Sequence, residues 1–132
     1  MNKKTQGNGA VVMLYIGNIK KEKKIAAFLR EKGLNIRYIK QGDINKPLNI
    51  ILGNAGKSGH LKMEEKSPLN YKLPEIIIFS GLSQEELYKL LDEYKDSGLE
   101  PVELKAVITP VNITWSLYRL ILELEREREE FK

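Results

Sequence analysis

The sequence predicts an α/β fold built from two tandem β-α-β-α units. Two stretches support this prediction, VVMLYIGNIKKEKKIAAFLREKGLNIRYIKQGD and EIIIFSGLSQEELYKLLDEYKDSGLEPVELKAVIT. Both have the layout of an apolar strand, a glycine, an amphipathic helix, Gly-Leu and a second strand, so that Gly17 aligns with Gly81 and Gly33 with Gly98. We therefore expect the two halves of the chain to share one plan.

The strand patterns predict a four-stranded, mainly parallel sheet in the order 2-1-3-4, with helices on both faces. Residues 10–16 and 75–80 are apolar at nearly every position, as in central strands that are covered on both sides. Residues 35–40 and 102–109 alternate between apolar and polar side chains, as edge strands do. We expect all four strands to be parallel. A ferredoxin-like double β-α-β sandwich with an extra C-terminal helix also places the first and third strands in the centre, and the pattern leaves this alternative open.

Capping and stop signals mark the ends of the helices. Ser83 and Glu86, three residues later, form a capping box that begins a helix, and Gly98 is a natural left-handed stop for it. Pro47 suits the first turn of a short helix that ends at Gly53. The last helix carries one apolar stripe, made of Leu117, Leu120, Ile121 and Leu124.

Length and composition are typical of one globular domain. The chain has 132 residues, of which 42% are hydrophobic and 30% charged, so it is neither disordered nor membrane-spanning in composition. We expect residues 1–132 to form a single domain made of two similar halves, 10–53 and 75–131, joined by a flexible loop, 54–74. No stretch approaches the roughly 18 apolar residues of a membrane helix. The first apolar run also lacks a small-residue cleavage site, so we expect a cytoplasmic protein.

The residue inventory limits the chemistry that the protein can perform. The chain has no cysteine, which excludes disulfides, thiolate catalysis, iron–sulfur clusters and the usual structural zinc sites. His60 is the only histidine. The paired carboxylates lie in predicted loops or on solvated helix faces, without the apolar setting that would raise a carboxyl pKa for acid–base catalysis. We expect no metal, no cofactor and no catalytic residue, although the sequence leaves an enzyme open.

The stretch NIILGNAGKSGH contains a Gly-Lys-Ser that suggests a phosphate-binding loop. A Walker A loop needs a glycine five residues before the glycine of Gly-Lys-Ser, directly after a buried strand and at the start of a helix. The residue five before Gly56 is Ile51, and the residues after Ser58 show no helical period. We interpret this stretch as a helix stop followed by a loop, with Lys57 and Ser58 in solvent.

Charge is distributed unevenly along the chain. Residues 1–66 carry a net charge of +9 and residues 67–132 a net charge of −5. This asymmetry indicates an acidic partner for the first half, or attraction between the halves within a chain or between subunits. Four lysines fall in the stretch NIKKEKK, residues 18–24, where they oppose the macrodipole at the start of a helix. Such a cluster is typical either of a solvated lysine face or of a phosphate-binding surface.

Polar residues follow three of the predicted strands. In a parallel sheet these turns meet at one edge, where helix N-termini favour an anion. The predicted ligand-binding residues are Asn18, Ser83, Lys105, Thr109, Asn112 and Trp115. Structural roles stay open for all of them: the short polar side chains are good N-caps, the Lys105 stem can cover apolar surface, and Trp115 can hold two turns together.

The stretch ELKAVITPVNITWSLYRLILELEREREE, with IIIFSGLSQEEL before it, resembles a bacterial family of small proteins that is described only as a domain of unknown function. Its members carry Leu-Lys-Ala-Val-x-Thr-Pro-x-Asn-x-x-Trp followed by an acidic amphipathic helix. The resemblance covers about residues 74–130, with Ile108 and Val111 where members often have Leu and Thr. It implies no activity. It implies that the family motif consists of Lys105, Thr109, Pro110, Asn112 and Trp115.

These observations predict a non-enzymatic binding or interaction module. Its partner would be a small anionic ligand or a protein, held at the edge formed by the Ser83 and Thr109–Trp115 turns. The alternative is association with a nucleic acid or another polyanion through the basic first half, which the lack of aromatic residues among the lysines and of a recognition motif disfavours. A homo-oligomer is compatible with both hypotheses, and no membrane partner is expected.

Overall fold

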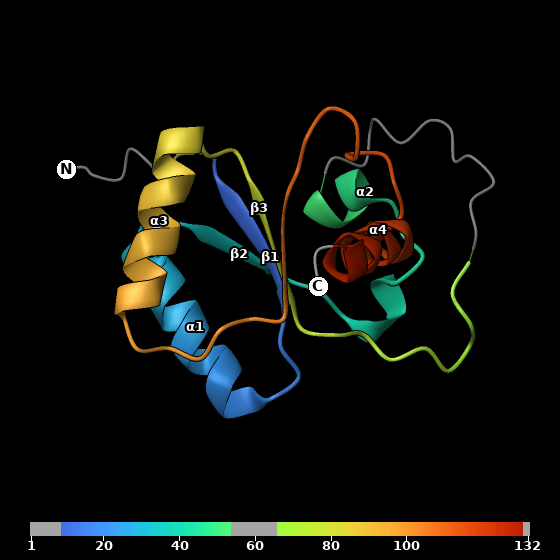
Figure 1. Ribbon diagram of the computed structural model, residues 1–132, viewed down its shortest axis with the longest axis horizontal. Helices are drawn as coiled ribbons and strands as arrows, with labels where there is room; N and C mark the ends of the chain where they lie inside the picture. The colour runs from blue at the N-terminus through green and yellow to red at the C-terminus, as the bar shows by residue number, and fades with distance from the viewer. Residues whose placement is uncertain (1–8, 54–65, 131–132) are drawn as a thin grey trace. The chain divides into compact units, whose positions relative to one another are not determined.

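The computed structural model describes residues 9–53 and 66–130 (Figure 1). The elements in chain order are β1 (Val11–Tyr15), α1 (Ile19–Glu31), β2 (Asn35–Tyr38), the 3-10 turn η1 (Gln41–Asp43), α2 (Leu48–Leu52), β3 (Ile76–Ser80), α3 (Gln84–Asp96), β4 (Leu104–Val107) and α4 (Leu117–Glu130). His60, the Gly-Lys-Ser sequence and most of the expected flexible loop lie outside the described residues. None of the described helices is long and apolar enough to cross a membrane.

The chain divides into two compact units. Unit 1 holds the described residues up to Tyr38 together with Pro74–Val107, and unit 2 holds Ile39–Leu73 together with the residues from Ile108 onward. Each unit therefore combines a segment of the first half of the chain with a segment of the second. Unit 1 contains the sheet, α1 and α3, whereas unit 2 contains η1, α2 and α4.

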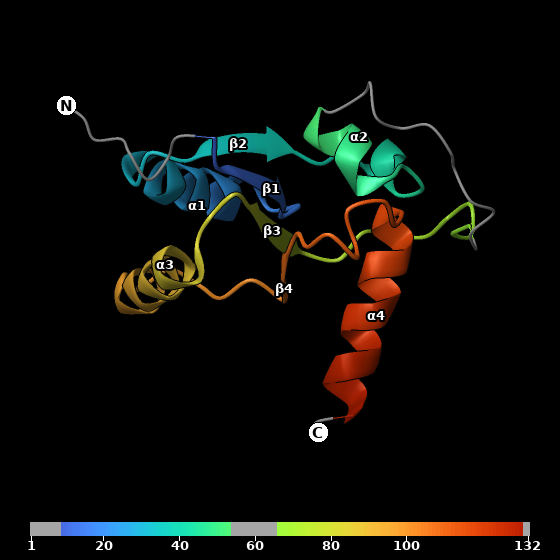
Figure 2. The ribbon, with the colours of Figure 1, turned by 90° about the horizontal axis from the view of Figure 1, so that it is seen from above.

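The sheet of unit 1 has the predicted order, β2-β1-β3-β4 (Figure 2). β1 pairs with β2 in parallel, and so does β3 with β4. The sheet is therefore mainly parallel, but β1 and β3 pair antiparallel in its centre, so the expectation of an entirely parallel sheet is wrong. The ferredoxin-like alternative does not apply, because the two strands of each β-α-β segment are direct neighbours instead of being separated by another strand.

Helices α1 and α3 cover the same face of the sheet, not opposite faces as expected (Figure 1). The reason is the antiparallel pairing of β1 with β3. Two β-α-β segments with the usual right-handed crossover place their helices on one face when the segments run in opposite directions. The residues that this face buries are Val12, Leu14, Ile77 and Phe79 of the strands with Ile25, Leu29 and Leu90 of the helices.

The register of β1 and β3 relates the two β-α-β segments of unit 1 by a local two-fold axis. Met13 pairs with Ile78, and each is the third of five residues in its strand. The ends of the strands are exchanged in the same way, since the first residue of β1 pairs with the last residue of β3. α1 and α3 also have equal length, 13 residues each.

Unit 2 shows the same two-fold relation in its main-chain hydrogen bonds. In both α2 and α4, two N–H groups of the first turn donate to carbonyl oxygens in the loop before the other helix. The four bonds are Leu48 to Trp115 (2.9 Å), Asn49 to Ile113 (3.0 Å), Leu117 to Lys46 (3.0 Å) and Tyr118 to Ile44 (2.8 Å). Pro47 and Ser116 face each other between them. These bonds satisfy N–H groups that have no partner within their own helix.

Candidate functional site

The predicted ligand-binding residues are divided between the units. Unit 1 contains Asn18, Ser83 and Lys105, and unit 2 contains Thr109, Asn112 and Trp115. Asn18 follows β1, and Ser83 follows β3. Because β1 and β3 are antiparallel, these two residues lie at opposite ends of the central strand pair, and the expectation that they share one edge is wrong.

Asn18 and Ser83 both cap helices. Asn18 Oδ1 accepts a hydrogen bond from the Lys21 N–H at 2.9 Å. Ser83 Oγ accepts from the Glu86 N–H at 3.0 Å, and the Ser83 N–H donates to the Glu86 carboxylate at 2.8 Å. The second arrangement is the capping box that the sequence predicts. Each side-chain oxygen therefore stabilises the first turn of its helix.

Thr109 and Asn112 close a turn with their own side chains. Asn112 is 8% exposed, and its Oδ1 accepts from the Thr109 N–H at 2.9 Å. Thr109 Oγ1 accepts from the N–H groups of Val111 and Asn112, at 3.2 and 3.1 Å. The first half contains an equivalent bond, since the Lys40 N–H donates to Asp43 Oδ2 at 2.9 Å. This part of the sequence motif thus has a structural role in the turn before α4.

Trp115 and Lys105 also make structural contacts. The guanidinium carbon of Arg119 lies 4.1 Å from the centre of the half-buried Trp115 ring. This distance is well within the roughly 6 Å limit for a cation–π contact. Lys105 lies on β4 and helps to line a cavity of about 20 Å³ in the core of unit 1, beside Phe28 and Tyr94. Its stem therefore covers apolar side chains, as snorkelling lysines do.

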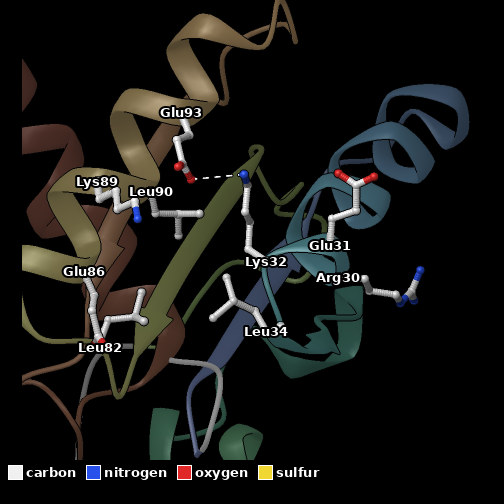
Figure 3. A pocket seen from close by; sticks show the side chains of 10 residues that line it. Arg30, Glu31, Lys32, Leu34, Leu82, Glu86, Lys89, Leu90 and Glu93 are labelled. Carbon is white, nitrogen blue, oxygen red and sulfur yellow. Dashed lines mark ion pairs between the residues drawn. The ribbon is translucent and has the colours of Figure 1, made fainter. Parts of the chain in front are cut away.

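Two of the cavities in unit 1 lie at opposite ends of the α1–α3 pair. The larger has a volume of about 490 Å³ and is formed by the end of α1, Gly33 and the first half of α3. Figure 3 shows Lys32 reaching across to Glu93, with Nζ and Oε1 3.1 Å apart, whereas Arg30 points away from α3. Its lining holds three basic and three acidic side chains: Arg30, Lys32, Lys89, Glu31, Glu86 and Glu93.

The smaller cavity, which we call the basic cavity, has a volume of about 300 Å³. Its lining consists of Asn18, Lys20, Lys21, Lys24 and Ile25 from α1 and its cap, with Gly98, Leu99 and Glu100 from the loop after α3. The local two-fold axis relates it to the larger cavity: Lys24 corresponds to Lys89, and Lys21 to Glu86. Lys20 and Lys21 thus stand where the equivalent helix has Glu85 and Glu86, whereas Lys24 corresponds to another lysine.

The three lysines of the basic cavity have different surroundings. Lys21 is tightly held, because its Nζ lies 2.9 and 3.1 Å from the two carboxylate oxygens of Glu75 and 2.9 Å from the Pro101 carbonyl oxygen. Lys20 and Lys24 are exposed, and neither has a carboxylate of the described residues within ion-pair distance. Two cations at this site are thus left to interact with solvent or a ligand.

Tyr94 supports the wall of the basic cavity. Its hydroxyl donates a hydrogen bond to the main-chain carbonyl oxygen of Glu100 at 2.5 Å. Burial, followed by the negative charges of Glu75 and Glu100, raises the pKa of Tyr94 to about 12. The phenol therefore stays protonated at neutral pH and acts as a hydrogen-bond donor, not as a base. Within residues 9–53 and 66–130, no three His, Cys, Asp or Glu side chains are placed to hold a metal ion.

One segment in the second half of the chain matches the model of a protein family. Residues 75–131 match the model of a family described as a domain of unknown function (DUF3783). This match confirms the resemblance seen in the sequence. The DUF3783 segment spans β3, α3, β4 and α4, and it supplies the loop side of the basic cavity. No curated protein and no solved structure matches the chain.

The sequence pattern identified only part of this cavity. Asn18 is a predicted ligand-binding residue that lines it, and so do three of the NIKKEKK lysines, Lys20, Lys21 and Lys24, for which the sequence leaves open a solvated face or a phosphate-binding surface. Glu75 and Glu100 were not singled out, because their proximity to Lys21 depends on the tertiary fold. The sequence signal that pointed to the site was the lysine cluster placed against the helix macrodipole.

Proposed function

We propose that the protein is a non-enzymatic binding module that holds a small anionic ligand in the basic cavity. One observation carries this proposal: Lys20 and Lys24 line a cavity at the positive end of a 13-residue helix and have no carboxylate partner among the described residues. The volume of about 300 Å³ corresponds to the lower range of small-molecule sites.

Electrostatics support the choice of an anion. Lys20 and Lys24 are four residues apart on one helix, where like charges destabilise the helix by roughly 0.2–0.5 kcal/mol. Lys20 lies in the first turn of α1, at the positive end of the helix dipole, which adds to the unfavourable energy. An anion bound between them would reduce both repulsions. The larger cavity offers no such gain, because its basic and acidic side chains are equal in number.

The structural roles of the other predicted residues also favour this cavity. The side-chain oxygens of Ser83, Thr109 and Asn112 accept main-chain hydrogen bonds in their own turns. These bonds explain why short polar residues follow the strands, without a ligand at those turns. We further propose that the two halves of the chain are repeats of one unit, which the reciprocal hydrogen bonds of unit 2 support. A cytoplasmic location and a bacterial source stay predictions from the sequence.

The proposal is tested by NMR titration of the isotope-labelled protein with methyl phosphate. We expect the amide signals of Lys20, Lys24 and Gly98 to shift in a saturable manner. The double substitution Lys20→Ala/Lys24→Ala should weaken binding at least ten-fold, because it removes the two cavity cations that have no carboxylate partner among the described residues.

The matched control is Lys89→Ala/Lys95→Ala, which removes the same charge from two exposed residues of α3 that do not line the basic cavity. This variant should bind methyl phosphate nearly as well as the wild type. Equal weakening in both double variants would show a response to net charge alone and would contradict the proposed site, as would the absence of saturable shifts. Strong binding of single-stranded RNA with a steep salt dependence would favour the polyanion alternative instead.

A further inference from the structure

We infer that Glu100 limits the preference of the basic cavity for multiply charged anions, an inference that rests on the function proposed above. Glu100 is the one carboxylate among the described residues that line this cavity. Its side chain is 77% exposed, and its Oε1 lies 3.7 Å from Lys21 Nζ. A negative charge is therefore present in a site whose other charged lining residues are lysines.

The position of Glu100 is fixed by its main chain. The Tyr94 hydroxyl holds the Glu100 carbonyl oxygen, and Lys21 holds the carbonyl oxygen of the next residue, Pro101, at 2.9 Å. These two bonds come from α3 and α1, so the loop is held from both helices. The main chain that carries Glu100 is therefore held in the wall of the cavity, and a change of rotamer moves only the exposed side chain.

Lys21 does not need Glu100 as a partner. Its ammonium group makes three shorter contacts, two with Glu75 and one with Pro101. The contact with Glu100 is longer, and the Glu100 side chain is mostly in solvent, where an ion pair contributes little. Glu100 therefore contributes a negative potential to the cavity more than it contributes to the stability of the fold.

The repulsion between Glu100 and a bound anion grows in proportion to the charge of the anion. At the same position, Glu100 raises the free energy of a bound dianion by twice as much as that of a bound monoanion. The factor by which Glu100 weakens binding of the dianion is therefore the square of the factor for the monoanion. The attraction of the lysines grows with the charge of the anion by the same law, so Glu100 reduces the preference of the cavity for multiply charged phosphates and lets singly charged anions, such as phosphodiesters and monocarboxylates, compete better.

The test uses two probes of similar shape, dimethyl phosphate with one negative charge and methyl phosphate with two at pH 8. Dissociation constants are measured by NMR titration for the wild type and for Glu100→Gln. The substitution should raise the affinity for dimethyl phosphate about two-fold and that for methyl phosphate about four-fold, given the screening of an exposed carboxylate.

The control variant Glu85→Gln makes the same change in net charge in the exposed first turn of α3, outside the cavity. It should leave both dissociation constants nearly unchanged. Suppose that the wild type binds the probes, but Glu100→Gln behaves like Glu85→Gln or changes both affinities by the same factor. The role of Glu100 is then overturned, while the proposed site stands. If the wild type binds neither probe, the proposed site itself fails.

Discussion

Gly81 combines a special backbone conformation with close packing. Its φ angle is +90°, a region that residues with a Cβ rarely occupy. A Cβ at this position would lie 3.0 Å from both the Ala10 Cα and the Gly9 carbonyl oxygen. Gly98 has a similar φ of +84°, but a Cβ there would have no atom within 4 Å. A comparison of the two positions therefore separates the cost of a positive φ angle from the cost of a steric contact.

We predict that Gly81→Ala lowers the free energy of unfolding by about 2–4 kcal/mol, and Gly98→Ala by about 1 kcal/mol. The common part is the strain of a positive φ. The additional part arises because the neighbours of Gly81 are main-chain atoms, which can move only with the strand. Urea unfolding at neutral pH measures both values. Equal losses in the two variants would show that the contact with residues 9 and 10 is relieved without cost.

At the scale of elements, Tyr94 links α3 to two neighbours. Its ring packs edge-on against Phe28 of α1 with 5.4 Å between the ring centres, and its hydroxyl bonds to the loop before β4. The pKa of about 12 lies above the ordinary value of 10.0, so the folded protein binds this proton more tightly than the unfolded chain. The resulting stabilisation is complete below pH 10 and is lost as the pH rises towards 12.

We therefore predict that the wild type loses more stability than Tyr94→Phe when the pH is raised from 8 to 11. The phenylalanine variant lacks the titrating group, while all other groups titrate in both proteins. Chemical denaturation at the two pH values measures the difference. Tyr88→Phe, which removes an exposed phenol from the same helix, serves as the control for the substitution itself. Identical slopes for Tyr94→Phe and the wild type would contradict the assignment.

Local sequence signals predicted the helices and strands. They did not predict that the two central strands, β1 and β3, run antiparallel. The capping box at Ser83 and Glu86 fixed the start of α3, and apolar runs identified β1 and β3 as central. A strand that is apolar on both faces has the same pattern in a parallel and in an antiparallel pair. The segment between α2 and β3 is long enough for either. The lysines of the basic cavity were visible in the sequence because they are neighbours in the chain. Asn18 was wrongly expected beside Ser83 because that position depends on the direction of the central strands.

At the scale of the whole molecule, each half of the chain supplies hydrogen-bond partners to the other half. The DUF3783 segment contains β3 and α4, but β3 pairs with β1, and the first N–H groups of α4 bond to carbonyl oxygens of residues 44 and 46. Without the first half, β3 would expose an unpaired apolar edge, and these N–H groups would lose their partners. Within unit 1, a second β3 can take the place of β1, and within unit 2, residues 113 and 115 of a second copy can supply the carbonyl oxygens, because the contacts of each unit obey their own two-fold symmetry.

We predict that a shortened chain of residues 66–132 forms a dimer, with two copies of β3 paired antiparallel about Ile78. An interface of this kind is isologous, so one surface serves both copies and the assembly closes at two. Sedimentation equilibrium gives the mass. Ile78→Asp, which places a charge at the fully buried centre of the strand pair, should abolish dimerisation together with folding. The exposed substitution Asp92→Asn should leave the dimer intact. A folded monomer of residues 66–132 would show that the first half is dispensable for this segment and would contradict the two-fold account of its contacts.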